Sequence, residues 1–162
     1  MNTNTVLNVT DLCKTYIVNK RQNNVLKNVN FTVSEGEMVA IMGPSGSGKT
    51  TLLNILAALD RPTEGEVFLN GRALSTIGEK EIASFRRQNL GFVFQDFNLL
   101  DTFTLEDNIY LPLVLAGKNY KEMSGKLETV AKRLGILPLL KKYPYEVSGG
   151  QKQRAAVARA II

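Results

Sequence analysis

The sequence predicts an α/β fold, and three features support this prediction. Met38–Met42 (MVAIM) is a continuous apolar run of strand length, which is typical of a parallel strand covered on both faces. The glycine-rich segment 43–48 follows it and leads into Lys49–Leu59, where apolar residues recur with helical spacing. Before this unit, Val6–Val9 and Val25–Val33 alternate apolar and polar residues, which predicts a meander of half-buried strands.

The elements that follow are predicted in chain order. Turn sequences at 62–65 and 70–71 bracket a short strand at Glu66–Leu69, and a mixed helical pattern covers Glu79–Gln88. Gly91–Gln95 (GFVFQ) is again an apolar run of strand length. From there the pattern is helical, in three stretches: Thr104–Ala116 with an expected kink at Pro112, Tyr120–Leu134, and a last helix from Gly149 or Gly150 with Ser148 as its N-cap.

Composition limits the class of protein. The 162 residues are 44% hydrophobic and 22% charged, which is the balance of one soluble globular domain. No stretch approaches the roughly 18 apolar residues of a membrane-spanning helix, and the first residues lack an export pattern, so a cytoplasmic location is expected. Cys13 is the single cysteine and there is no histidine, which excludes an internal disulfide, Ser-His-Asp catalysis and histidine-based zinc sites within these residues. The net charge of +5 suits a nucleotide, a nucleic acid or an acidic partner equally.

A phosphate-binding motif lies between the predicted strand and helix. The residues Gly43, Pro44, Ser45, Gly46, Ser47, Gly48, Lys49 and Thr50 match G-x-x-x-x-G-K-S/T. Backbone N–H groups of such a loop and of the helix N-terminus are oriented donors for a triphosphate. We expect Lys49 to bridge the β- and γ-phosphates, Thr50 to ligate Mg²⁺, and Thr51 to lie near the α- and β-phosphates. The alternative, an ordinary glycine-rich turn that carries a lysine, is much less favoured by the strand and helix on either side.

A second glycine motif opens the last predicted helix. Val147 is followed by Ser148, Gly149, Gly150 and Gln151, a segment that exposes backbone N–H groups beside a serine hydroxyl. Taken alone, this segment is equally compatible with a plain helix cap. Together with the loop at 43–50, it resembles the ATP-binding cassette (ABC) ATPases, whose signature motif reads L-S-G-G-Q and differs here by valine in place of leucine.

The resemblance covers the whole chain. It implies a P-loop NTPase fold with a RecA-like parallel core and an N-terminal antiparallel β subdomain over 1–95, a helical subdomain over 96–148 and a signature helix over 149–162. It also implies ATP and Mg²⁺ as cofactors, Tyr16 as the aromatic residue that stacks on adenine, and Gln95 as the Q-loop glutamine that touches Mg²⁺ and the attacking water. The signature residues would contact the γ-phosphate bound to a second copy, so a head-to-tail homodimer with ATP at its interface is expected.

Residues 85–113 and 143–161 look most like the exporters that confer resistance to bacitracin and related peptides. We therefore expect an ATPase subunit bound to a membrane permease, peripheral on the inner face of the membrane, with no nucleic acid partner. Lipoprotein release, macrolide export and cell division are served by related branches and remain alternatives, as does a regulatory or scaffold module without turnover. A soluble ABC protein of DNA repair or translation is less favoured, because the interval 96–147 is too short for a coiled-coil insert.

The family's Walker B carboxylates and H-loop histidine have no counterpart in these residues. The sequence is therefore expected to be incomplete at the C-terminus, and a polypeptide of these 162 residues is expected to be poorly stable and to hydrolyse no appreciable ATP.

Overall fold

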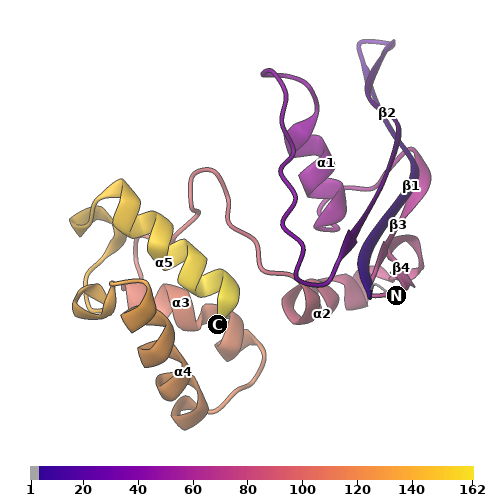
Figure 1. Cartoon of the computed structure of the whole chain (residues 1–162). Coiled ribbons are helices and arrows are strands. Elements are labelled where there is room, and N and C mark those ends of the chain that lie inside the picture. Colours follow the sequence, from indigo (N-terminus) through magenta and orange to yellow (C-terminus); the bar gives the residue numbers. More distant parts are fainter. Residues whose placement is uncertain (1–3) are drawn as a thin grey trace. The chain divides into compact units, whose positions relative to one another are not determined.

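The structure, a computed structural model, describes residues 4–162, without the side chains of residues 120–122 (Figure 1). The chain divides into two compact units, Met1–Ser84 and Phe85–Ile162. The subdomain boundaries expected at 95 and 148 from the sequence remain predictions.

The first unit is built on an antiparallel sheet with the strand order β2-β1-β3-β4. Its strands are β1 (Thr5–Val18), β2 (Arg21–Ser34), β3 (Glu64–Leu69) and β4 (Arg72–Ala73). Asn19 and Lys20 join β1 to β2 with positive φ angles of 50° and 63°, a turn whose twist matches that of the strands. The predicted alternating segments therefore do lie in strands, and these strands are longer than the sequence pattern indicated.

Helix α1 (Lys49–Leu56) packs against one face of this sheet (Figure 1). Leu52 and Ile55 on α1 are buried against Leu12, Leu26 and Val67 of the strands. The helix is shorter than the predicted Lys49–Leu59, since Ala57 is its C-cap. This packing fixes the first turn of α1, and with it the end of the glycine-rich loop, on the sheet.

Two predicted strands are absent from the described part of the chain. Met38–Met42 and Gly91–Gln95 are both irregular, and Met38 and Met42 are 96% and 88% exposed. A parallel strand needs a neighbouring strand to satisfy its backbone groups, and every strand pair among residues 4–162 is antiparallel and involves β1 or β3. The prediction of strands at these two segments was wrong for this structure, because an apolar run predicts burial and does not by itself supply a hydrogen-bonding partner.

The second unit is helical. Helix α2 (Glu79–Asn89) leads into it and is followed by α3 (Leu105–Leu115), α4 (Tyr120–Arg133) and α5 (Gly149–Ile161). Short 3-10 turns lie at Leu74–Thr76 in the first unit and at Leu137–Leu139 and Pro144–Glu146 in the second. In the core, Leu105 and Ile109 of α3 lie against Ala155 and Ala158 of α5, so these two helices run side by side (Figure 1). The predicted helices are confirmed to within a few residues at each end, and Pro112 lies inside α3 as expected.

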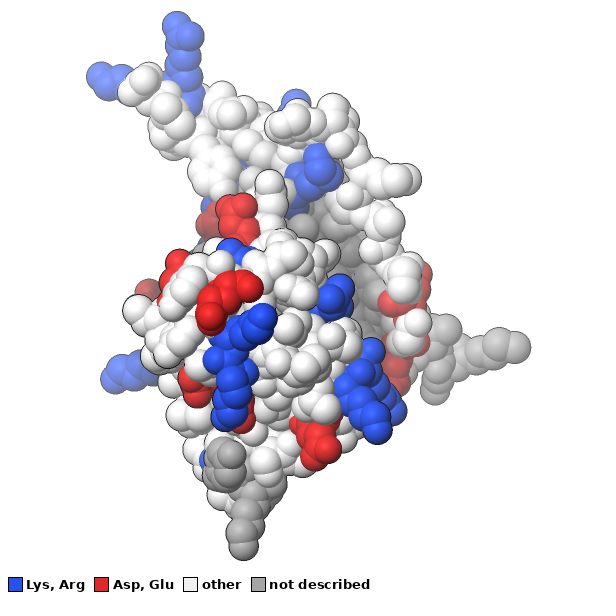
Figure 2. Space-filling model, turned by 90° about the vertical axis from the view of Figure 1, so that its left-hand side faces the viewer, with Lys and Arg blue, Asp and Glu red and all other residues white. Residues whose placement is uncertain are grey.

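The surface carries both signs of charge. On the face shown in Figure 2, Lys and Arg side chains are interspersed with Asp and Glu, so neither sign dominates there. None of the described helices has the length and apolar character that crossing a membrane requires.

Gly65 marks a close approach between β3 and β1 and gives a stability prediction. Its φ is +82°, and a Cβ there would lie 2.3 Å from the carbonyl oxygen of Asp11, at the irregularity in the β1–β3 register. We expect Gly65→Ala to lower the free energy of unfolding by about 2–4 kcal/mol, measured by urea denaturation. Gly71→Ala is the matched control, because Gly71 has a similar φ of +75° and open space around it. Equal losses in the two variants would show that backbone strain, and not the steric clash with Asp11, accounts for the effect.

Candidate functional site

The glycine-rich loop ends where α1 begins. Gly48 is the N-cap of α1 with a φ of 90°, and no side chain caps this helix. A Cβ at Gly48 would lie 3.0 Å from atoms of both Val25 and Leu26 on β2, so the loop passes too close to the sheet for a larger residue. Among the described residues, the N–H groups of Gly48, Lys49 and Thr50 donate to no protein acceptor. The start of α1 therefore presents several oriented donors to the exposed side of the loop.

Lys49 folds back across the loop. Its Nζ donates to the carbonyl oxygens of Gly43 at 2.9 Å and Pro44 at 2.7 Å, and lies 3.4 Å from Ser47 Oγ. The ammonium is thus held by the backbone of the glycine-rich loop, next in the chain to the N–H groups of residues 48–50 that have no protein acceptor. A concentration of positive charge and N–H donors of this kind suits a polyphosphate anion.

The residues around the glycine-rich loop can also be compared with the ligands that Mg²⁺ requires. Within the part of the chain that the structure describes, no three His, Cys, Asp or Glu side chains form a group that could hold a metal ion. In the first unit the Thr50 hydroxyl is exposed at the start of α1. Mg²⁺ prefers oxygen ligands and keeps several waters, so a single hydroxyl together with phosphate oxygens fits this ion.

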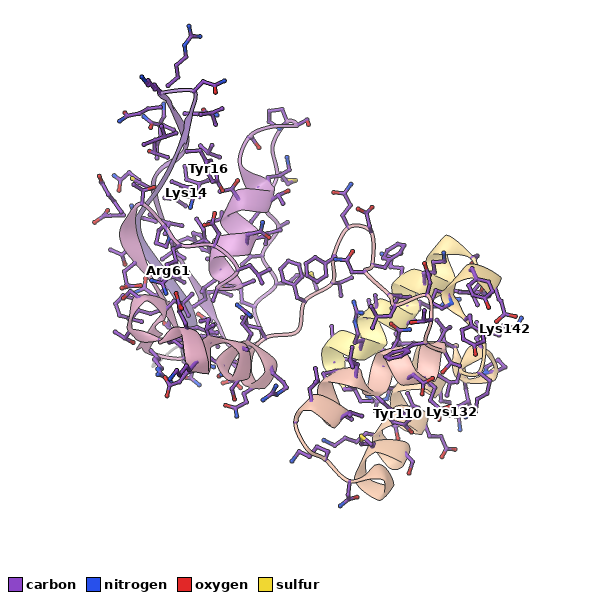
Figure 3. All side chains as sticks on the ribbon, turned by 180° about the vertical axis from the view of Figure 1, so that it is seen from behind. Lys14, Tyr16, Arg61, Tyr110, Lys132 and Lys142 are labelled. Atoms are coloured by element: carbon purple, nitrogen blue, oxygen red, sulfur yellow. The ribbon has the colours of Figure 1, made fainter. Side chains whose placement is uncertain are left out.

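Tyr16 lies on the face of the sheet that α1 covers. Residues two apart in a strand share a face, and Lys14 and Tyr16 of β1 both point toward α1 (Figure 3). The Tyr16 hydroxyl donates to Asp60 Oδ2 at 2.8 Å, and Lys14 Nζ donates to Asp60 Oδ1 at 2.7 Å. Thr51 on α1 lies close enough to the Tyr16 hydroxyl to act on its pKa, which it lowers. The structure thus brings the predicted residues Tyr16 and Thr51 together at the glycine-rich loop.

The ionisation of Tyr16 and Asp60 reflects these contacts. The hydrogen bond to Asp60 raises the pKa of Tyr16, with desolvation adding to it, because the phenol must keep its proton to donate. For Asp60, burial favours the neutral acid, but the hydrogen bonds from Lys14, Tyr16 and the Arg61 N–H outweigh it and lower the pKa below its ordinary value. A lowered carboxyl pKa stabilises the fold above about pH 4, and this contribution is lost as the pH falls through the folded-state value.

The serine-glycine segment in the second unit forms a regular helix start. Ser148 caps α5: its N–H donates to Gln151 Oε1 at 2.8 Å, and its Oγ accepts from the Gln151 N–H at 3.4 Å. Gly149 and Gly150 between them are exposed. The predicted N-cap is confirmed, and it leaves the first-turn amides of α5 at the surface.

Gln95 is exposed in an irregular segment of the second unit. Two residues further on, the chain is tied to α5, because the Arg159 guanidinium donates to the carbonyl oxygens of Phe97 and Asn98, both at 2.7 Å. Sequence reasoning missed Arg159, as it missed Lys14 and Asp60. All three act through partners at least 44 positions away in the chain, and no local pattern indicates such pairs.

The Ser148 cap gives a second stability prediction. Ser148→Ala removes the acceptor for the Gln151 N–H and so breaks one of the two hydrogen bonds that join Ser148 and Gln151 in the capping box. We therefore expect a loss of about 1 kcal/mol in the free energy of unfolding. Ser148→Asn keeps an oxygen acceptor at the N-cap and should lose much less. A thermal or urea melt compares the three proteins, and the cap interpretation is wrong if the Ala and Asn variants are destabilised equally.

A phosphate loop over an antiparallel sheet, with a helical unit whose last helix starts at Ser-Gly-Gly-Gln, defines an ATP-binding cassette. Residues 26–162 match the model of the ABC transporter family, and the chain belongs to this family. The dimeric structure of the bacterial ABC transporter cassette MJ0796 superposes with a TM-score of 0.88 at 39% identity, covering 96% of this chain and 68% of that one. Another structure of MJ0796, bound to ADP and Pi in a dimeric post-hydrolysis state, matches equally well. These comparisons confirm the predicted family and fold class.

Three curated relatives are also ABC transporter proteins. The chain is 55% identical over 159 residues to an uncharacterised ABC transporter ATP-binding protein, YvcR of Bacillus subtilis, covering 97% of this chain and 61% of YvcR. It is 46% identical to the bacitracin export ATP-binding protein BceA of Halalkalibacterium halodurans, covering 97% and 62%. It is 43% identical to the macrolide export ATP-binding/permease protein MacB of a Shewanella strain, covering 97% and 24%. The chain thus spans about three fifths of the length of YvcR and BceA.

Proposed function

We propose that the protein is the ATP-binding and hydrolysing subunit of an ABC exporter for antimicrobial peptides. The observation that carries the proposal is that one loop combines the Lys49 ammonium, bonded to the Gly43 and Pro44 carbonyl oxygens, with an α1 N-terminus that no side chain caps. This arrangement supplies charge and oriented donors to a triphosphate at little entropic cost. The bound MgATP supplies the phosphoanhydride bond whose hydrolysis releases the free energy for transport.

The residues take distinct roles in this proposal. Backbone N–H groups at 43–48 hold the phosphates, and Lys49 moves from the Gly43 and Pro44 carbonyls onto the β- and γ-phosphates. Thr50 and Gln95 hold Mg²⁺, and Tyr16 stacks on the adenine, a contact worth about 1–3 kcal/mol for base–aromatic stacking in nucleic-acid sites. The remaining predicted contacts come from the loop residues Pro44, Ser45, Gly46 and Ser47, and from Thr51.

The exposed N-terminus of α5 supports a second part of the proposal. Ser148, Gly149, Gly150 and Gln151 of one subunit contact the γ-phosphate bound to another, so two copies close over two nucleotides. The dimeric state of the MJ0796 cassettes is consistent with this arrangement. A membrane permease subunit then holds the pair at the inner face of the cell membrane and receives the movement that closure produces.

The transported substrate is proposed from the relatives. Similarity to BceA favours bacitracin and related peptides, and similarity to MacB makes macrolides the second candidate. Deletion of the gene should lower the inhibitory concentration of bacitracin, and the wild-type gene, but not a Lys49→Ala version, should restore it. Sensitivity to a macrolide in place of bacitracin would shift the proposal to the second candidate. Unchanged resistance to both would contradict the export role.

Turnover requires carboxylates that the resemblance does not place among these residues. A polypeptide of residues 1–162 is therefore expected to show no ATP hydrolysis above background in a phosphate-release assay. Hydrolysis that disappears with Lys49→Ala would contradict this and would indicate a catalytic carboxylate within the 162 residues.

A further inference from the structure

We propose that Asp60 and Lys14 are positioning residues that fix the orientation of the Tyr16 ring and leave one of its faces open to a purine base. The proposal rests on the proposed function, because it assumes that Tyr16 contacts the base of ATP. It assigns a task in nucleotide recognition to two residues outside the phosphate loop and the signature segment.

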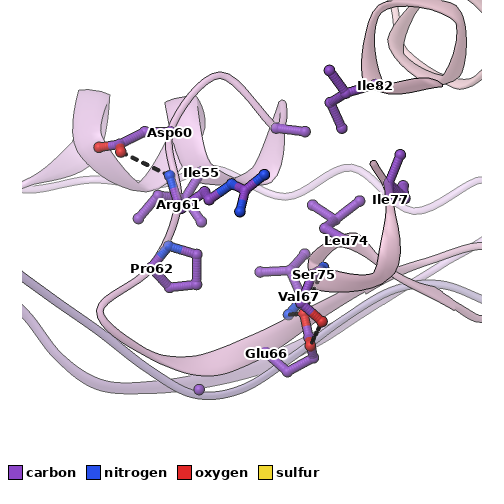
Figure 4. A pocket seen from close by; sticks show the side chains of 12 residues that line it. Ile55, Asp60, Arg61, Pro62, Glu66, Val67, Leu74, Ser75, Ile77 and Ile82 are labelled. Carbon is purple, nitrogen blue, oxygen red and sulfur yellow. Dashed lines mark hydrogen bonds between the residues drawn. The ribbon is translucent and has the colours of Figure 1, made fainter. Parts of the chain in front are cut away.

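Asp60 holds the far end of the Tyr16 ring. Its Oδ2 accepts from the Tyr16 hydroxyl at 2.8 Å, and its Oδ1 accepts from Lys14 Nζ and from the Arg61 N–H, both at 2.7 Å. The Arg61 contact is drawn in Figure 4, where Asp60 and Arg61 lie among the residues that line a cavity of about 210 Å³. Both carboxylate oxygens are thus engaged, and the carboxylate itself is held by the backbone that follows α1. A ring bonded at its hydroxyl to an anchored group has both of its torsion angles restricted.

Lys14 distinguishes the two faces of the ring. Its Nζ lies 4.8 Å from the centre of the Tyr16 ring, and its side chain is only 11% exposed. Lys14 Nζ also donates to the Arg61 carbonyl oxygen at 2.6 Å, which keeps the ammonium in place. One face of the ring is therefore occupied, while Tyr16 as a whole remains 38% exposed. A base can stack only on the free face.

Tyr16 lies near the exposed end of its strand. The next residues along β1, Ile17 and Val18, are 73% and 61% exposed and lead into the hairpin turn. The hydrogen bond to Asp60 and the Lys14 ammonium over the ring hold Tyr16 at this exposed end. Their removal should therefore allow the ring to move without unfolding the sheet.

The test compares MgATP with inorganic tripolyphosphate, which shares the phosphates but lacks the base. Binding to the whole protein is measured by titration calorimetry for wild type, Asp60→Asn and Tyr16→Phe. The Asp60 carboxylate accepts hydrogen bonds with two oxygens, whereas the amide in Asp60→Asn has only one oxygen to accept them. Tyr16→Phe keeps the aromatic ring but removes the hydroxyl. Each variant should bind MgATP about 3- to 10-fold more weakly, the equivalent of one hydrogen bond. Tripolyphosphate affinity should not fall, which also shows that the variants are folded. The double variant should lose no more than either single one, because both break the same contact.

Electrostatics alone predicts the opposite sign for Asp60→Asn. Removal of a negative charge near a polyanion should strengthen the binding of ATP and tripolyphosphate alike. Glu64→Gln removes an exposed carboxylate from β3, at the position that pairs with Cys13 of β1, and serves as the matched control, with no loss of MgATP affinity expected.

Tyr16→Ala separates the failure of this proposal from the failure of the proposed function. If Tyr16→Ala weakens MgATP binding while Asp60→Asn and Tyr16→Phe do not, the positioning role is overturned and the base contact stands. If Tyr16→Ala leaves MgATP affinity unchanged, the base contact is wrong and the positioning proposal fails with it. Equal losses for MgATP and tripolyphosphate in Asp60→Asn would also overturn the proposal.

Discussion

In the full-length ATPase subunit proposed above, Lys49→Ala should reduce the steady-state ATP turnover by at least about 100-fold, the largest effect expected from a single substitution here. In the structure, the Lys49 ammonium donates to the carbonyl oxygens of Gly43 and Pro44. The same charge would neutralise the γ-phosphate as negative charge shifts during hydrolysis, and the variant leaves only backbone N–H groups and hydroxyls for that task. A phosphate-release assay on that full-length subunit, together with the proposed permease, measures the loss.

Two comparison variants make this prediction specific. Lys49→Arg keeps the charge but replaces a compact ammonium by a planar fork, so it should recover little of the turnover. Lys27→Ala removes an exposed lysine from β2 of the same unit and should retain full turnover. If Lys27→Ala and Lys49→Ala were equally impaired, net charge would explain the effect and the specific role of Lys49 would be wrong.

The glycine-rich loop and the start of α1 could be predicted from the sequence because both depend on neighbouring residues. Eight consecutive residues carry the loop glycines, the lysine and the hydroxyl, and the start of α1 follows them directly. The N-cap at Ser148 is local in the same way, since Ser148 and Gln151 bond to each other three positions apart. Motifs that span only a few consecutive residues depend on backbone geometry, and the neighbouring residues largely determine that geometry.

The contacts that anchor Tyr16 could not be predicted in this way. Asp60 lies 44 positions from Tyr16 in the chain. The residues next to Asp60 in the sequence indicate only a turn after a helix. The role of Asp60 depends on how α1 packs against β1. This packing in turn depends on which side chains of the two elements are buried together. The wrong strands at Met38–Met42 and Gly91–Gln95 have a related cause, since pairing depends on segments distant in the chain. Family resemblance pointed to Tyr16 and Gln95, whereas the hydrogen bond between Tyr16 and Asp60 came only from the structure.

Asn108 gives the second large prediction, and it concerns the stability of the segment that follows Gln95. Asn108 in α3 is fully buried. Its Oδ1 accepts from the Leu100 N–H at 2.7 Å, and its Nδ2 donates to the carbonyl oxygens of Leu100, Phe103 and Thr104 at 3.0 to 3.2 Å. One side chain thus satisfies the backbone of the loop that connects the Gln95 segment to α3. We expect Asn108→Leu to lower the free energy of unfolding by about 2–4 kcal/mol, because it removes all the hydrogen bonds of a fully buried amide and leaves the Leu100 N–H without its acceptor.

Urea denaturation measures this loss, and two variants define its cause. Asn23→Leu makes the same substitution at an exposed position of β2 and should change the free energy of unfolding by less than about 0.5 kcal/mol. Asn108→Asp keeps the shape but, when ionised, turns a carboxylate oxygen toward three carbonyl oxygens. Its destabilisation should therefore be greater at about pH 7 than at about pH 4, where a protonated acid can still donate one hydrogen bond. A loss that is the same at both pH values would show that the donor function of Asn108 is not what stabilises this loop.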